Sequence, residues 1–239
     1  MGDRSDDERR VHGTDRRLES TLSALKQRGS ALLIVGSVPA DSYIRACSWL
    51  LGDDAAGPRR HLFVTTDADL PRVGDRFTPE LNRLRRATTE WITWSSCVRR
   101  AHETQSVDRE RLHSRRAPDG NLPMLGARIS EAIRDIDDSA NGLAPAELRL
   151  CLDSLESLVS EFDRESVFRF LHILIGRLRS VRGMGHFHLP VERESEVVSV
   201  FAELFDATVE LRLGGDGLQQ RWHLHEADLT SNWLSVSPA

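Results

Sequence analysis

The sequence predicts an α/β protein with three layers, in which helices cover both faces of a mostly parallel central sheet and an antiparallel hairpin forms one edge. Two observations carry this prediction. Short apolar runs alternate with segments of helical periodicity along most of the 239 residues, as in βαβ units whose strands pair in parallel. The last two runs, 206–213 and 218–227, alternate polar and apolar residues around the turn GGDG, which is typical of a hairpin.

The first half of the chain predicts alternating helices and strands. Leu18, Leu22 and Leu25 form one apolar stripe within 15–28, which indicates a helix that ends at Gly29. The run ALLIVGS that follows is continuous and apolar, as expected of a strand buried on both faces. The remaining elements of this half are a helix over 41–51, a strand over 61–66, a helix over 79–87 and a strand over 90–96.

The second half continues the alternation up to the hairpin. MLGARISEAIRDI is amphipathic with helical spacing, and SVFRFLHILIGRLRSV is the longest and most apolar helical segment. The predicted elements are a helix over 124–136, a strand over 148–153, a helix over 166–181, a strand over 185–190 and a helix over 192–205.

The length and the single alternating pattern favour one domain over 15–227. We expect residues 1–14 to form a mobile, charged tail and residues 97–123 to form an arginine-rich surface excursion. Residues 228–239 read as a C-terminal tail. Trp233 within it docks either on its own domain or on a partner, and the sequence does not decide between the two.

The composition excludes several classes of protein. No apolar run approaches the ~20 residues of a membrane span, and the N-terminus has no apolar signal core. We therefore expect a cytoplasmic protein with no membrane partner. A net charge of −5 disfavours binding of nucleic acid by charge. Lys26 is the only lysine, which disfavours a lysine-based catalyst or phosphate clamp.

The loop after the first strand has the layout of a phosphate-binding P-loop. That motif, G-x-x-x-x-G-K-[ST], uses backbone N–H groups and lysine to hold phosphates and a hydroxyl to hold Mg²⁺. Here Gly36 is retained and Ser37 follows it, whereas Asp41, Ser42 and Tyr43 stand at the second glycine, the lysine and the hydroxyl positions. The plainer alternative is an ordinary strand–turn–helix connection with Asp41 as the N-cap.

A second strand end completes the pattern. LRLCLDSLESL is an apolar strand that ends in Asp153, like the strand whose carboxylate orders Mg²⁺ in P-loop proteins. With ALLIVGSVPADSYIRACSWLLG, HLFVTTD and GMGHFHLP, this segment resembles the RecA/KaiC-like ATPase superfamily, in particular its small, haloarchaeal-type single-domain members. The resemblance covers roughly residues 15–227. It implies a RecA-like fold and, in an active member, a water-activating carboxylate at Asp67.

The departures from the family pattern predict a non-catalytic member. Without the lysine, the second glycine and the hydroxyl, Asp67 and Asp153 do not make an ATPase, so we expect no enzyme activity, no resident cofactor and no metal. We expect a pseudo-ATPase that acts through protein partners in regulation or signalling, and family members also assemble as homo-oligomers. One alternative is weak ATP and Mg²⁺ binding or slow hydrolysis, with Arg45 replacing the lysine.

Other candidate sites have plainer explanations. His186 and His188 alternate on one strand, as do His223 and His225, so each pair points to one side of the sheet. Either pair could share a metal with Asp153 or Asp206, although histidines at sheet edges are more often hydrogen-bonded structural residues. The second functional alternative is a nucleic-acid-binding regulator that uses arginines of 97–120, such as Arg115 and Arg116.

The three cysteines do not suggest a site of their own. Cys47, Cys97 and Cys151 lie far apart and form no CxxC pair, so their spacing excludes a disulfide scaffold and a cysteine-based zinc site. Cys47 falls in an apolar helix and Cys151 in a buried strand, and both therefore read as core residues.

Overall fold

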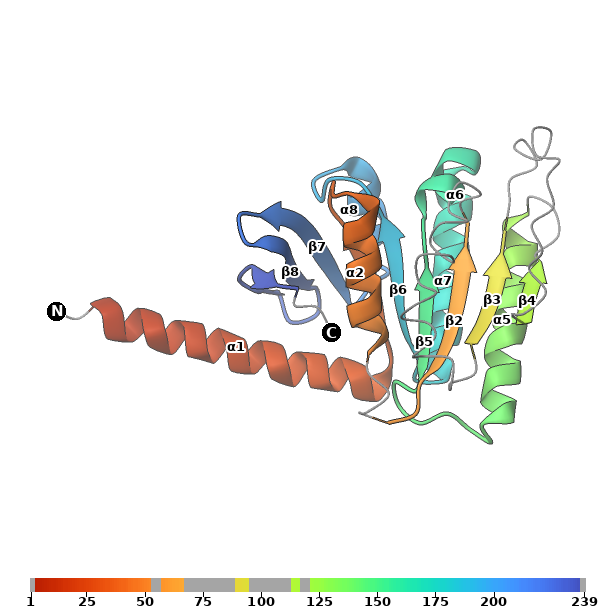
Figure 1. Ribbon diagram of the computed structural model, residues 1–239, viewed down its shortest axis with the longest axis horizontal. Helices are drawn as coiled ribbons and strands as arrows, with labels where there is room; N and C mark the ends of the chain where they lie inside the picture. Colours follow the sequence, from red (N-terminus) through yellow and green to blue (C-terminus); the bar gives the residue numbers. More distant parts are fainter. Residues whose placement is uncertain (1–2, 53–56, 67–88, 95–112, 117–120, 237–239) are drawn as a thin grey trace.

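The computed structural model of the chain is built around one twisted sheet (Figure 1). It describes residues 3–52, 57–66, 89–94, 113–116 and 121–236. Within these residues, ten strands form one sheet in the order β10-β8-β7-β1-β6-β5-β2-β3-β4, and β9 also pairs with β8. The seven strands from β7 to β4 in this order are parallel to their neighbours, and β8 is antiparallel to β7. The predicted α/β class and the antiparallel C-terminal hairpin are confirmed.

The bounds of the strands and helices follow the predicted order closely. The strands are β1 (Ser30–Val35), β2 (Arg60–Thr65), β3 (Thr89–Thr93), β4 (His113–Arg116), β5 (Leu148–Leu152), β6 (Met184–Leu189), β7 (Ala207–Gly214), β8 (Gly217–Leu224), β9 (Leu229–Thr230) and β10 (Leu234–Ser235). The helices are α1 (Asp3–Arg28), α2 (Ala40–Leu51), α5 (Leu122–Ser139), α6 (Glu156–Glu161), α7 (Arg164–Ser180) and α8 (Glu196–Ala202). None of the helices in these segments is long and apolar enough to cross a lipid bilayer.

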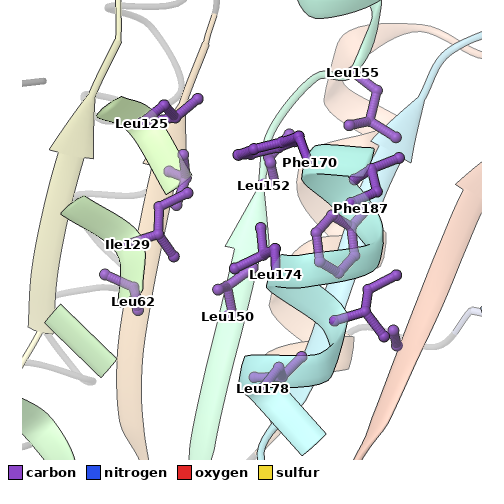
Figure 2. Packing of buried hydrophobic residues seen from close by; sticks show 14 of the residues in the cluster. Leu62, Leu125, Ile129, Leu150, Leu152, Leu155, Phe170, Leu174, Leu178 and Phe187 are labelled. Carbon is purple, nitrogen blue, oxygen red and sulfur yellow. The ribbon is translucent and has the colours of Figure 1, made fainter. Parts of the chain in front are cut away.

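Helices cover both faces of the sheet because the parallel strands are apolar on both sides. Side chains of α5, α6, α7 and α8 pack on one face in the largest core cluster. Figure 2 shows its centre, where Ile129 of α5 and Leu174 of α7 lie over Leu150 and Leu62 of the sheet. On the other face, α1 and α2 pack on β1, β7 and β8. Burial of this much apolar surface is the main stabilising contribution to such a fold.

β1 is the central strand, and all six of its residues are buried. It pairs in parallel with β6 on one side and β7 on the other. Leu33 points into the cluster under α7 and Ile34 into the cluster under α1 and α2, as the alternation of side chains along a strand requires. The continuous apolar run in the sequence is explained by this double burial.

The N-terminal segment differs from its prediction. Residues 3–14, expected as a mobile tail, are the first part of α1, which continues without a break to Arg28. The apolar stripe that predicted the helix is confined to the part of α1 that packs on the core through Leu18 and Leu25. Acidic and basic residues recur three and four positions apart in 3–14, a spacing that favours a helix without a core contact.

Three further predictions are corrected or completed. Residues 113–116 of the predicted excursion form β4, which pairs with β3. The helix predicted over 192–205 begins only at Glu196, and the short helix α6 was not predicted because it carries only two turns. The predicted helix over 79–87 and most of the 97–123 excursion lie outside the described residues.

Residues 229–236 are an interrupted edge strand and not a free tail. β9 and β10 both pair with the outer side of β8, and Trp222 N donates to Ser231 Oγ between them. Trp233 lies in the interruption and docks on its own domain, where the guanidinium carbons of Arg212 and Arg221 lie 3.8 Å and 4.5 Å from its ring centroid. These cation–π contacts answer the question that the sequence left open.

Candidate functional site

The topology marks one position at the carboxyl edge of the sheet where a ligand would be expected. The connection that leaves β1 runs through α2 toward β2, whereas the connection that leaves β6 runs through α8 to β7 on the other side of β1. β1 and β6 are neighbours, so their carboxyl ends form a topological switch point, the usual ligand position in open α/β sheets. The loop that begins at Gly36 lies at this point.

Gly36 is required by the packing of the sheet. Its φ is +127°, in the region that favours glycine. A Cβ at this position would lie 2.2 Å from the carbonyl oxygen of Leu211 in β7. Gly36 N also donates to Val191 O at 2.8 Å, which ties the loop after β1 to the loop after β6. The glycine is therefore explained without a bound phosphate.

Tyr43 closes the loop from the α2 side. Its hydroxyl donates to Gly36 O at 2.5 Å, and its ring lies 5.3 Å from that of His188. Burial raises the pKa of the Tyr43 phenol further above its usual range, which keeps the phenol neutral. The hydroxyl that would hold Mg²⁺ in a P-loop is replaced here by a hydroxyl already bonded within the loop.

The start of α2 corrects one alternative from the sequence. The residue at the N-cap position is Pro39, and Asp41 lies in the first turn of α2. There its negative charge interacts favourably with the positive end of the helix dipole. Asp41 is therefore not the N-cap. Ser42 is buried, and its backbone N donates to Pro39 O, whereas Ser37 is exposed.

Asp153 joins the ends of β5 and β2. Its Oδ1 accepts from Thr66 N at 2.8 Å and lies 3.1 Å from Thr66 Oγ1. The Thr66 hydroxyl also contacts the carbonyl of Ser154. Ser154 Oγ, and not Asp153, accepts from the first turn of α6, at Glu156 N. Asp67, the position implied for water activation, lies outside the described residues.

The structure brings the predicted loop and Asp153 to the same edge of the sheet, with the end of β6 between them. Leu155 N donates to His188 O at 2.7 Å, which connects the segment after Asp153 to β6. The loop after β1 and Asp153 at the end of β5 therefore lie at one edge of the sheet, two strands apart. The side chains of Tyr43 and Asp153 are engaged in bonds within the protein.

The two histidine pairs behave differently. His223 lies 3.0 Å from Glu210 Oε2 and 3.2 Å from Thr230 Oγ1, and His225 lies 2.9 Å from Phe205 O. These two are hydrogen-bonded structural residues, as the plainer interpretation expected. Asp206 lies at the opposite, amino edge of the sheet, where its Oδ2 accepts from Ala31 N.

His186 and His188 instead belong to a buried cluster with two cysteines. Cys151 of β5 is in register with His186 of β6, and Cys47 of α2 lies above them. Cys47 Sγ is 3.3 Å from Cys151 Sγ and 3.1 Å from His186 Nε2. One ligand atom of each of the four residues lies within 4.8 Å of the others. Asp153 and Asp206, considered as further ligands, are not members of the cluster.

Burial sets the protonation states in the cluster. It lowers the pKa of His188 to about 3 and the pKa of His186 well below its usual range. It also raises the pKa of the Cys151 thiol. At neutral pH the two imidazoles are therefore uncharged, with a lone pair available on one ring nitrogen each. Two uncharged imidazoles thus meet two buried cysteines in the interior.

Cys47 and Cys151 meet in this cluster although they are 104 positions apart in the sequence. In a parallel sheet, residues far apart in sequence become neighbours because a crossover connection separates the paired strands, as for Cys151 and His186. The signal present in the sequence was a His-x-His pattern on a buried strand with cysteines in other buried elements. Which strands are neighbours could not be read from it.

The comparison with protein families gives one match. Residues 29–211, more than half of the chain, match a family described as "Family of unknown function (DUF7504)". The matched residues include the Gly36 loop, Asp153 and all four members of the buried cluster. No protein of curated function matches the chain.

The position of Gly36 yields a prediction for stability. Gly36→Ala should lower the free energy of unfolding by about 3 kcal/mol or more, because the new Cβ meets the backbone of β7 and the φ is unfavourable. Urea unfolding measures the effect. Gly215→Ala is the matched control, since no atom of the described residues lies within 4 Å of its Cβ position, and it should stay within about 0.5 kcal/mol of the parent chain. A Gly36→Ala variant that loses little of the free energy of unfolding would show that β7 does not confine the loop.

A buried histidine in β2 yields a prediction for pH. His61 is fully buried, and burial, followed by the charge of Arg149, lowers its pKa to about 4. A depressed histidine pKa leaves stability intact above pH 6.5, because neither state is protonated there. Below pH 6.5 the unfolded chain takes up a proton that the folded chain refuses, so stability falls toward pH 4.

His61→Leu should reduce this loss by about 3 kcal/mol at pH 4. The measurement is urea unfolding at several values between pH 7 and pH 4, provided the chain is folded at each. His172→Gln, at an exposed position of α7, serves as the control and should follow the parent chain. Parallel curves for His61→Leu and the parent chain would contradict the assignment of the acid sensitivity to His61.

Proposed function

Since the chain belongs to the DUF7504 family, whose function is unknown, we propose its function from the site itself. The proposed function is that of a non-catalytic α/β module of the RecA/KaiC-like type, which acts through protein partners in regulation or signalling. The observation that carries the proposal is the bond from Tyr43 to Gly36 O at the switch point. It fastens the loop to its own helix at the position where a nucleotide-binding loop would hold phosphate and Mg²⁺.

Charge also disfavours a nucleotide at this loop. Asp41 places a carboxylate in the first turn of α2, where a triphosphate would bring further negative charge. Lys26 is the only lysine of the chain and lies in the last turn of α1, next to the amino end of β1. It is therefore at the wrong edge of the sheet for a phosphate at Gly36. These residues do not fit Mg-ATP, and we derive no step through it.

The bonds of Asp153 support a structural role for this carboxylate. It accepts two contacts from Thr66 and so fixes the end of β2 against the end of β5. A carboxylate that orders Mg²⁺ and its waters needs its oxygens directed at the ion, and one oxygen is already committed here. The proposal therefore treats Asp153 as a link between strands.

α1 supports the part of the proposal that concerns partners. The second half of α1 packs on the core through Leu18 and Leu25. The first half extends away from the sheet and is not covered by other elements in Figure 1. This half of the helix is rich in acidic and basic residues in the sequence, and we propose that a protein partner recognises it. The alternative that rests on arginines 97–120 lies mostly outside the described residues.

Nucleotide binding is tested by thermal unfolding with and without millimolar Mg-ATP or Mg-ADP. A ligand at ~100 times its Kd adds ~2.7 kcal/mol, which is about 5–10 °C for a chain of this size. We expect no shift above about 1 °C and no phosphate release. A saturable rise that is lost in Asp153→Asn would show that the site binds nucleotide, and phosphate release lost in the same variant would overturn the non-catalytic assignment.

The role of α1 is tested by deleting residues 1–14. We expect the deletion to leave the unfolding midpoint within about 2 °C, because this part of α1 extends away from the sheet in Figure 1. Partners captured by cross-linking in a lysate should be lost with the deletion and retained by Lys26→Arg, a change elsewhere on α1. Capture of the same partners by the truncated chain would contradict a role for the projecting helix.

A further inference from the structure

The buried cluster beneath α2 gathers donors from three separate elements. Cys47 comes from α2, Cys151 from β5, and His186 and His188 from β6. Each of the four side chains is at most 4% exposed. We propose that these four residues bind one Zn²⁺ ion in a tetrahedral Cys₂His₂ site that fastens α2 to the sheet.

The distances between donor atoms fit a tetrahedral ion after small side-chain adjustments. Bond lengths of ~2.3 Å to sulfur and ~2.0–2.1 Å to nitrogen place two sulfurs ~3.8 Å apart and a sulfur and a nitrogen ~3.5 Å apart. The Cys47–Cys151 and Cys47–His186 distances are 3.3 Å and 3.1 Å. These pairs need to move apart by about half an ångström to admit the ion. The sulfur–sulfur distance is also far longer than the ~2.05 Å of a disulfide.

The net charge of the four ligands together with the ion suits a buried site without water. On binding, each thiol releases one proton to solvent and becomes a thiolate, and each imidazole supplies the lone pair of an uncharged ring. Two thiolates and one Zn²⁺ then sum to zero. A neutral assembly is the kind that can be buried at low cost, whereas an unbalanced ion in the interior is expensive.

The polar atoms of the cluster are poorly satisfied without an ion. Nε2 of His188 is buried and has no hydrogen-bond partner among the described residues. The two hydrogen-bonding contacts between members of the cluster, Cys47–Cys151 and Cys47–His186, both involve sulfur, which is a weak hydrogen-bonding atom. A metal ion would give His188 Nε2 a partner and replace the weak contacts by four bonds.

The choice of donors selects the ion. Sulfur and imidazole ligands suit zinc, whereas Mg²⁺ and Ca²⁺ prefer oxygen, and the cluster contains no carboxylate. With four protein ligands the coordination is closed, which is typical of a structural and not a catalytic site. Leu51 and the stacked pair Phe63 and Trp91 pack in the same cluster as the cysteines and exclude water from it.

The first experiment measures metal in the full-length chain, purified under reducing conditions without chelator from cells supplied with zinc. Elemental analysis should give about one zinc per chain in the parent protein. Chelation should lower the unfolding midpoint by about 10 °C, as expected for loss of a ligand present at ~1,000 times its Kd. Addition of Co²⁺ to the reduced, metal-free chain should give the ligand-field bands of tetrahedral cobalt with thiolate charge transfer.

Matched variants separate the site from general metal binding and from misfolding. His188→Ala and Cys47→Ser should lose the bound zinc and the tetrahedral cobalt spectrum. His188→Cys, which preserves a donor at the same place, should retain zinc and change the cobalt spectrum to that of a three-sulfur set. His172→Gln removes an exposed histidine of α7 and should leave zinc content unchanged.

Three results would overturn the proposal. The first is a parent chain that is folded and reduced, yet carries less than about one tenth of an ion and gives no tetrahedral cobalt spectrum. The second is equal zinc in His188→Ala and in the parent chain, which would place the ion elsewhere. The third is a mass two hydrogens lower before reduction, with peptides joined through Cys47 and Cys151, which would show that the pair forms a disulfide.

Discussion

The complete burial of β1 is the constraint on which the rest of the structure depends. A strand with parallel partners on both sides and apolar side chains on both faces must be covered by helices above and below. That requirement places α7 on one face and α1 with α2 on the other. It also fixes the switch point, because the chain leaves β1 on one side and returns to β7 on the other.

The two faces of the sheet are chemically unequal. In β5, Leu148, Leu150 and Leu152 point into the cluster under α5 and α7, whereas Arg149 and Cys151 lie on the alternate side. β6 shows the same division, with Phe187 on the α7 face and the two histidines on the α2 face. The face under α5 and α7 is therefore a pure hydrophobic core. The face under α2 carries the buried polar groups from which a specific site can be built.

Much of the fold could be predicted from the sequence. Apolar residues that recur every two positions in a strand, or about every 3.6 positions in a helix, indicate which side chains are buried. The strand at ALLIVG, the long helix at α7 and the terminal hairpin all carry strong patterns. α1 was predicted too short, since its first half has charge spacing and no apolar stripe. The same holds for the candidate site. The absence of a lysine from the loop after β1 could be recognised from the sequence alone. The meeting of Cys47 and Cys151 depends on strand order, which no local pattern encodes.

The interrupted strand at residues 229–236 also has a consequence for self-association. An uncovered β8 would present a row of free N–H and C=O groups, a template on which another chain could add a strand. β9 and β10 pair with these groups of β8 in two short segments. The break between the two segments, where Trp233 lies over Arg212 and Arg221, interrupts the regular outer edge that a further strand would need. The terminal segment therefore disfavours edge-to-edge aggregation at this edge of the sheet.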